Sequence, residues 1–363
     1  MHANARRLVV ATAATAVAGA LVLTAPAALA TTSPRAAAST DQATIGLFGE
    51  QDPTYDGVYR QSLSLIALDT AGARVPKASV KWLLRQQCPN GRFPSYTDLV
   101  GKCGVGEGDS TAIATIALRR VGERGAARAA LGWLLKQQTP SGGWEFNAGF
   151  GANANTTGLA IQAMVAMKVK PSTVTTNRTG PQFLRSLQLR CSADAPSRGA
   201  LDYQVQDPLA ANDYATAQAT QALAGTSLPV EPSTGRKGLP SLTCPRDGAQ
   251  PSPSAVAGGY LGRTIKLNDG SIPSSFGPGA DLGSTANAVM SLVATGVGGN
   301  QTDAAMLTLE SNATTFTRDD SDAVLPASSA ALALAAHATS GDPRSVGSTN
   351  PVRDIRSSRT LAG

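Results

Sequence analysis

Several residue types that carry chemistry are scarce in this chain. Aromatic residues make up 4% of the sequence, and its two histidines are His2 and His337. A zinc site has too few ligands, because the four cysteines are not closely paired and His337 is the one histidine outside the N-terminal end. Lysine and arginine are scattered, with no run dense enough for a nucleic-acid surface. We therefore expect no metal, no cofactor and no nucleic-acid partner.

Long hydrophobic runs are also absent, except at the N-terminal end. Arg6 and Arg7 precede an apolar stretch that ends at Leu23, and Ala28-Leu29-Ala30 fits the small-x-small cleavage pattern. No later run is long enough to span a bilayer. We expect residues 1–30 to be a signal peptide cleaved near Ala30, with the mature protein secreted and not anchored in the membrane. An uncleaved N-terminal anchor is the alternative.

The four cysteines are interpreted through that export. In an oxidising compartment two disulfides are the default. Of the three connectivities we favour Cys88–Cys103 and Cys191–Cys244, because each closes one loop between neighbouring helices.

What the chain does contain is an internal repeat. Val80-Lys81-Trp82-Leu83-Leu84-Arg85-Gln86-Gln87, followed by a turn and Phe93, aligns with Leu131-Gly132-Trp133-Leu134-Leu135-Lys136-Gln137-Gln138, followed by a turn and Trp144. Weaker copies begin at Phe183 and Tyr260. Each copy is an amphipathic helix that stops at a Pro/Gly turn. Self-similarity at a period near fifty residues indicates a repeat architecture.

Between these copies lie helices of small and apolar residues. An all-round apolar helix is buried on every side. These segments are Gly57–Ala71, Asp109–Val121, Asn155–Met167, Asp213–Ala224, Leu282–Thr295 and Pro326–Ala338.

Half-exposed helices alternating with buried ones describe a double-layered ring. Six inner candidates predict an all-α fold, a closed (α/α)₆ toroid of inner and outer helix hairpins, in place of an open solenoid whose ends need caps. We expect the toroid to span residues 51–340. Residues 31–50 are expected to be a flexible N-terminal segment and residues 341–363 a disordered tail.

The pattern from Gln137 and Gln138 to Gly142 and Trp144 resembles the QW motif of squalene cyclases and other class II terpene cyclases. The resemblance covers residues 55–340 and extends to other toroids, including protein prenyltransferase β-subunits, complement-type thioester domains and cobalamin carriers. It implies the fold, from which function does not follow. The prenyltransferase zinc set and the thioester Cys-Gly-Glu-Gln segment are missing here.

Class II cyclases carry a D-x-D-D-T-A signature whose middle aspartate protonates an alkene. The resemblance places Asp109 at that position, with Glu107 in place of the first acid and Ser110 in place of the last. Such an acid must be kept neutral by burial and a neighbouring carboxylate, which Glu107 could supply. The competing interpretation, which we favour, is that Asp109 caps its helix, as polar residues do at equivalent positions such as Asn155, Asn212 and Asp281.

The aromatic content and the single ring both argue against a cyclase, because such enzymes stabilise cations with aromatic faces and pair two helical domains. We therefore predict a binding protein whose ring mouth takes an apolar or glycan-like ligand or an envelope component. A cyclase-like enzyme using Asp109 is the first alternative, and a cobalamin-type carrier is the second. The candidate ligand-binding aromatics are Tyr59, Phe93, Trp144, Phe146, Phe150, Tyr203, Tyr214 and Phe276.

Overall fold

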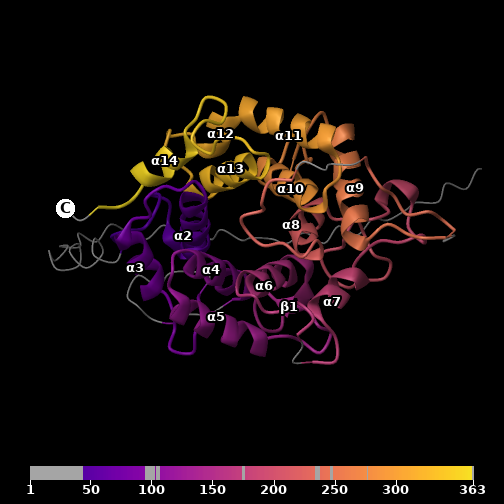
Figure 1. Cartoon of the computed structure of the whole chain (residues 1–363), viewed down its shortest axis with the longest axis horizontal. Coiled ribbons are helices and arrows are strands. Elements are labelled where there is room, and N and C mark those ends of the chain that lie inside the picture. Colours follow the sequence, from indigo (N-terminus) through magenta and orange to yellow (C-terminus); the bar gives the residue numbers. More distant parts are fainter. Residues whose placement is uncertain are drawn as a thin grey trace, which may run out of the picture.

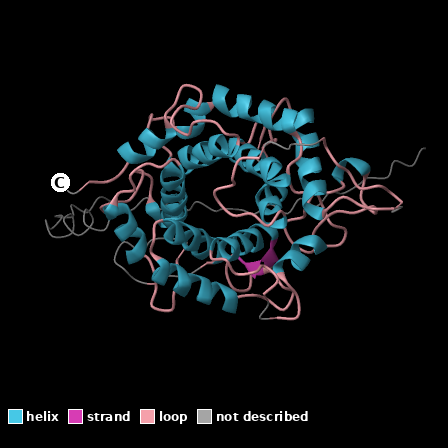
Figure 2. Ribbon diagram, in the orientation of Figure 1, coloured by secondary structure: helices cyan, strands magenta, loops and turns pink. Residues whose placement is uncertain are grey.

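The computed structural model describes residues 44–94, 103, 107–173, 176–233, 238–245, 248–275 and 277–361. The expected signal peptide lies outside the described residues. Figure 2 shows two concentric rings of helices. The inner ring consists of α2 (Pro53–Thr70), α4 (Gly108–Arg120), α6 (Ala154–Ala166), α8 (Asp213–Leu223), α10 (Leu282–Thr295) and α13 (Pro326–Ala338). Each inner helix packs against the next, and α13 packs against α2, so the ring is closed.

The outer ring is formed by the amphipathic helices. They are α3 (Lys77–Arg85), α5 (Arg124–Lys136), α7 (Gly180–Ser186), α9 (Pro253–Leu267), α11 (Gly299–Ser311), α12 (Ala313–Thr317) and α14 (Pro351–Ser357). A short 3₁₀ turn (Ala195–Ser197) and the antiparallel strands β1 (Trp144–Glu145) and β2 (Ala152–Asn153) lie in the connections. The all-α (α/α)₆ toroid predicted from the sequence is confirmed (Figure 1).

A repeated hydrogen bond joins the two layers. After four of the outer helices, the backbone N–H of an apolar residue donates to a threonine hydroxyl on the next inner helix. The pairs are Phe93 to Thr111 (3.0 Å), Trp144 to Thr157 (2.9 Å), Leu201 to Thr216 (2.8 Å) and Ile272 to Thr285 (3.0 Å). The bond draws the apolar side chain between the layers, where all four are buried.

The glutamines of the repeat tie neighbouring outer helices together. Gln138 donates to the carbonyls of Gly142 and of Arg178, just before α7. Gln87 donates to Ala126 in α5, and Gln188 to Pro253 at the start of α9. A side chain that bonds two carbonyls of different segments fixes the distance between them. The QW-like motif therefore has a structural role in this chain.

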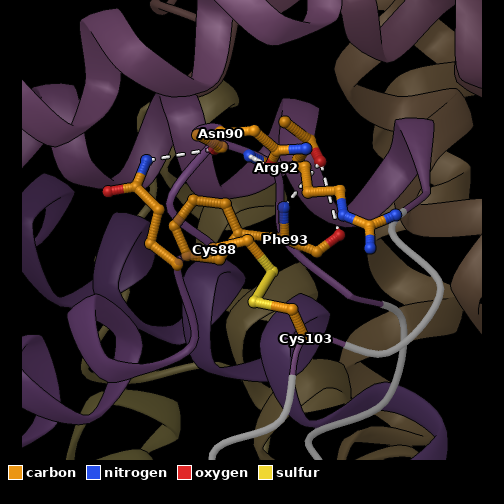
Figure 3. The surroundings of a disulfide bond; sticks show 8 residues. Cys88, Asn90, Arg92, Phe93 and Cys103 are labelled. Carbon is orange, nitrogen blue, oxygen red and sulfur yellow. Dashed lines mark hydrogen bonds between the residues drawn. A yellow bond between two sulfur atoms is a disulfide. The ribbon is translucent and has the colours of Figure 1, made fainter.

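Both predicted disulfides are present, Cys88–Cys103 and Cys191–Cys244. Figure 3 shows the first beside Phe93, in the turn that also holds Asn90 and Arg92. It joins the turn after α3 to the segment that precedes α4.

The C-terminal segment, which the sequence analysis expects to be disordered, carries α14 and closes the outer ring. Val352 and Ile355 are buried in the core, and the buried Asp354 carboxylate lies 3.4 Å from the guanidinium of Arg318. The prediction of a disordered tail is wrong for residues 341–361, because these contacts come from distant parts of the chain that local sequence does not display.

Residues 44–50 belong to the toroid as well, which moves its N-terminal boundary upstream of residue 51. Phe48 is buried and pairs with Arg359. The buried Arg60 donates to the carbonyls of Phe48 and Gln51, and Gln61 donates to that of Gly46. Buried side chains on α2 thus hold the incoming segment, so the predicted flexibility of residues 44–50 is wrong.

Candidate functional site

The N-terminal ends of the inner helices surround the mouth of the ring. Asn153, Asn212 and Asp281 cap α6, α8 and α10, each accepting a hydrogen bond from the backbone N–H three residues on. At α4 the arrangement differs, because the cap residue is Glu107, whose side chain makes no cap bond, and Asp109 is the second helical residue. The prediction that Asp109 caps its helix is therefore wrong, and so is that for Asn155, which also lies two residues past the cap.

Gly108 explains why α4 starts where it does. Its N–H donates to the Phe146 carbonyl at 2.9 Å. A Cβ at this position would lie 2.4 Å from the Thr156 side chain and 2.6 Å from the Glu145 carbonyl oxygen. Only glycine allows so close an approach of backbones. The contact starts the helix at residue 108 and turns the Asp109 side chain toward α6.

Asp109 is half-buried, and its carboxyl group faces the protein interior. Burial raises its pKa to about 6, and the hydroxyl of Thr156 opposes the shift. Its Oδ1 atom is buried and has no hydrogen-bond partner within the described residues. Because the charged form is disfavoured, Asp109 is part protonated near neutral pH. The main cause of the raised pKa is burial; the carboxylate of Glu107 is not among its causes.

Three tyrosines surround Asp109. Its negative charge contributes to raising the pKa of Tyr59, Tyr203 and Tyr214, after burial of the phenols as the largest cause. Tyr59 comes from α2, Tyr214 from α8, and Tyr203 from the loop before α8. Helix α2 and the segment around the start of α8, far apart in sequence, therefore place phenols around one carboxyl.

Amide side chains extend this polar cluster into the ring. Asn155 Nδ2 donates to Gln218 Oε1, and Gln218 Nε2 lies 3.5 Å from the Tyr59 hydroxyl. A hydrogen bond with Asn155 lowers the pKa of Tyr214, against the larger effect of burial. The network connects α6, α8 and α2 across the mouth.

A cavity of about 240 Å³ lies inside the ring, lined by five of the six inner helices. Its polar lining includes Gln162, Gln218, Gln221 and Asn287, and its apolar lining includes Leu63, Leu159 and Met290. Gln162 and Gln221 are each 1% exposed, and their Oε1 atoms have no hydrogen-bond partner in the described part of the chain. The loop after α8 contributes Leu228 to the lining. The cavity is therefore small, and amide side chains line it beside apolar ones.

The predicted site residues divide into three groups. Asp109, Tyr59, Tyr203 and Tyr214 come together at the mouth. Phe93 and Trp144 are fully buried between the layers, so the prediction that they face a ligand is wrong. Their hydrogen bonds to inner-helix threonines hold them there, and Trp144 Nε1 also donates to the Leu134 carbonyl.

The remaining predictions concern more peripheral residues. Glu107 is buried and accepts a hydrogen bond from the Ser110 hydroxyl at 2.8 Å. Phe146 is half-buried and Phe150 is exposed, in the connection between β1 and β2. Phe276 lies outside the described residues.

Sequence reasoning missed the lumenal amides. Tyr214, Gln218 and Gln221 follow a spacing of four and three residues, and Asn155 and Gln162 are seven apart. Residues so spaced share one face of a helix. A polar stripe on helices otherwise made of apolar residues was the signal available.

No group of three or more His, Cys, Asp or Glu side chains that could hold a metal ion occurs among the residues that the structure describes. Over the same residues, no helix is both long and apolar enough to cross a membrane.

No protein-family model matches the sequence, and no curated protein is similar to it. Solved structures are similar in fold. A protein from Actinoplanes matches with a TM-score of 0.52 at 14% identity, over 84% of this chain and 99% of that one. The apo form of the type II terpene cyclase MstE from Scytonema matches with a TM-score of 0.45 at 14% identity, over 80% of this chain and 81% of that one.

An ent-copalyl diphosphate synthase from Streptomyces platensis matches with a TM-score of 0.49 at 17% identity, over 78% of this chain and 50% of that one. At such identities the likeness concerns the fold alone. The closed double ring and the match to the Actinoplanes protein show that the chain has the α/α-toroid fold, as its resemblance to the terpenoid cyclase and prenyltransferase toroids implies.

Proposed function

We propose that this toroid binds a small, hydroxyl-rich, glycan-like ligand in its lumen. The amide side chains that line the cavity are the observation that supports it. Two glutamines that line the cavity, Gln162 and Gln221, have buried Oε1 atoms without a hydrogen-bond partner in the described residues. The buried Oδ1 atom of Asp109, which lies beside the cavity-lining Tyr59 and Tyr214, has none there either. A buried acceptor left unpaired costs about 1–3 kcal/mol. A ligand that carries several hydroxyl donors would satisfy these groups, whereas a hydrocarbon ligand would leave all of them unpaired.

The rim of the ring supports the same ligand class. Tyr203 and Tyr214 are 36% and 48% exposed beside Asp109, and Tyr55 at the start of α2 is also exposed. Aromatic rings with an apolar face and a polar tip suit a ligand that is apolar on its ring faces and polar at its edges. A sugar ring has this character.

The size of the cavity limits the ligand. At about 240 Å³ it falls below the roughly 300–1,000 Å³ of pockets for drug-sized ligands. One sugar ring inside the lumen, with further units over the tyrosines of the rim, matches these dimensions. A corrinoid is far larger than this cavity, which argues against a cobalamin carrier.

The test is direct binding of defined sugars. N-acetylglucosamine, chitobiose, cellobiose, maltose and trehalose would be titrated by calorimetry against the wild type and Gln218→Leu, which removes the amide between Asn155 and Tyr59. Leu307→Ala, an exposed position on outer helix α11, is the matched control. We expect one sugar to bind, with affinity reduced at least tenfold in Gln218→Leu and unchanged in the control. Failure of every sugar, or equal loss in both variants, would refute the proposal.

We further propose that the protein is secreted after cleavage near Ala30. The two disulfides are compatible with an oxidising compartment. An intact mass of the protein recovered from culture medium tests this directly. We expect the mass of residues 31–363 less four hydrogens. A native mass with a discrete adduct would also name the ligand.

A cyclase-like activity is the second candidate, supported by the raised pKa of Asp109 and the tyrosines around it. Against it stand the lumenal amides, whose oxygens would capture a carbocation. Incubation with linear isoprenoids of 15 to 30 carbons, wild type against Asp109→Asn, decides between the two. A cyclised product that is lost in Asp109→Asn would establish the enzyme.

A further inference from the structure

A second groove lies on the outer wall, where the two ends of the chain meet. It has a volume of about 750 Å³ and lies between the N-terminal end of α3 and helix α14. Its basic lining residues are Arg74, Lys77, Arg344, Arg353, Arg356 and Arg359, and no carboxylate lines it. Six of the 31 basic residues of the chain therefore gather in this one groove.

Few of these cations are neutralised. The Asp354 carboxylate is 3.6 Å from Arg353 but also lies 3.4 Å from Arg318. Asp342 lies 4.0 Å from Arg344. Arg74, Lys77 and Arg356 make no ion pair within the described residues, and the Nε atom of Arg359 is buried without a hydrogen-bond partner there. The positive charges gathered in this groove add up to one positive potential. An anion that entered the groove would be attracted by all of them.

Helix α3 adds to the positive potential. It begins at Lys77 after Pro76, which offers no side-chain cap, and both residues line the groove. The first N–H groups of a helix carry a partial positive charge that favours anions.

We propose that this groove binds a linear polyanion whose charges are phosphate groups. Arginine guanidinium groups match phosphate oxygens in a two-pronged geometry, and five of the six cations are arginines. The cations stand on two sides, Arg74 and Lys77 by α3 and Arg353 and Arg356 on α14, so several phosphates along a chain would engage them together. No lining residue is aromatic, so the groove has no platform for stacking bases and a nucleic acid is disfavoured. This site is separate from the lumenal cavity.

Inorganic tripolyphosphate is the probe, titrated by calorimetry at 25 and 150 mM NaCl. The test variant is Arg353→Gln with Arg356→Gln, two exposed positions of α14. The control, Arg124→Gln with Arg128→Gln, removes the same charge from exposed positions of α5. We expect at least a tenfold loss of affinity in the test variant, less than twofold in the control, and a salt-dependence slope reduced by about two. Circular dichroism and the melting temperature confirm that each variant is folded.

Equal losses in the two variants, or no binding by the wild type at 25 mM NaCl, would overturn the proposal. Two competitors test the ligand class. Polyglutamate of the same charge should compete poorly; equal competition would mean that charge alone is recognised. A single-stranded oligonucleotide that binds more tightly than polyphosphate of equal charge would identify a nucleic-acid site, and the phosphate-polymer proposal would be wrong.

Discussion

Replacing Asp109 with asparagine should stabilise the protein at high pH, although it removes a residue of the candidate site. The unfolded-state pKa of an aspartate is about 3.9, and burial raises the folded-state pKa to about 6. Below pH 4 the carboxyl is protonated in both states and costs nothing. As the pH rises from 4 to 6, the unfolded chain ionises first, so folding stability falls.

The size of this loss follows from the shift. Each pKa unit corresponds to 1.36 kcal/mol, so two units give at most about 3 kcal/mol above pH 6. Asparagine has nearly the same shape and cannot ionise. The free energy of unfolding of Asp109→Asn relative to wild type should therefore increase by up to about 3 kcal/mol between pH 4 and pH 8. Comparing the two pH values cancels any pH-independent cost of the amide.

Urea unfolding followed by tryptophan fluorescence, with the disulfides intact, measures this difference. Asp52→Asn is a control of opposite sign, because hydrogen bonds from Thr54 lower the pKa of Asp52. That variant should lose stability relative to wild type as the pH rises. An effect of Asp109→Asn that does not change with pH, or that becomes more destabilising from pH 4 to pH 8, would show that burial does not raise the pKa of Asp109.

Three further predictions concern the fold and share the urea assay. Trp144→Ala should cost about 3–5 kcal/mol, because Trp144 is fully buried and its indole donates to Leu134; a cost below 1 kcal/mol would place it at the mouth instead. Gly91→Ala should cost about 1–3 kcal/mol or more, because φ is +95° and a Cβ would lie 2.3 Å from the Ala129 oxygen; Gly132→Ala, exposed with nothing within 4 Å, should instead stabilise by roughly 0.5–1 kcal/mol. Ile355→Ala should cost about 2–4 kcal/mol, because its side chain is buried in the core, whereas a disordered tail would show no change.

The inner ring was the most predictable part of the fold. A helix that is apolar all round must be buried on every side, which places it in the inner layer. The expected helices Leu282–Thr295 and Pro326–Ala338 coincide with α10 and α13. The outer closure was not predictable. Helix α14 has seven residues, and its apolar side chains Val352 and Ile355 pack into the core. Its order depends on partners far away in sequence, such as Arg318.

Part of the candidate site was also predictable from the sequence. Asp109 was singled out by its place in a motif, and three of the tyrosines do surround it. Phe93 and Trp144 were misplaced because an aromatic residue after a turn can fold toward the lumen or between the layers. The choice is made by the N–H bonds to Thr111 and Thr157, which the sequence alone does not reveal.

The pairing of the chain ends governs how this protein must fold. Phe48 pairs with Arg359, and the Thr360 N–H donates to Leu47, about 310 residues away along the chain. A linear array of hairpins can assemble outward from any point, because each unit needs only its neighbours. A ring has no such freedom in its final step, and contacts this distant are slow to form. The cavity between the inner helices is enclosed only when α13 packs against α2, so the site that we propose for a ligand exists only once the ring has closed.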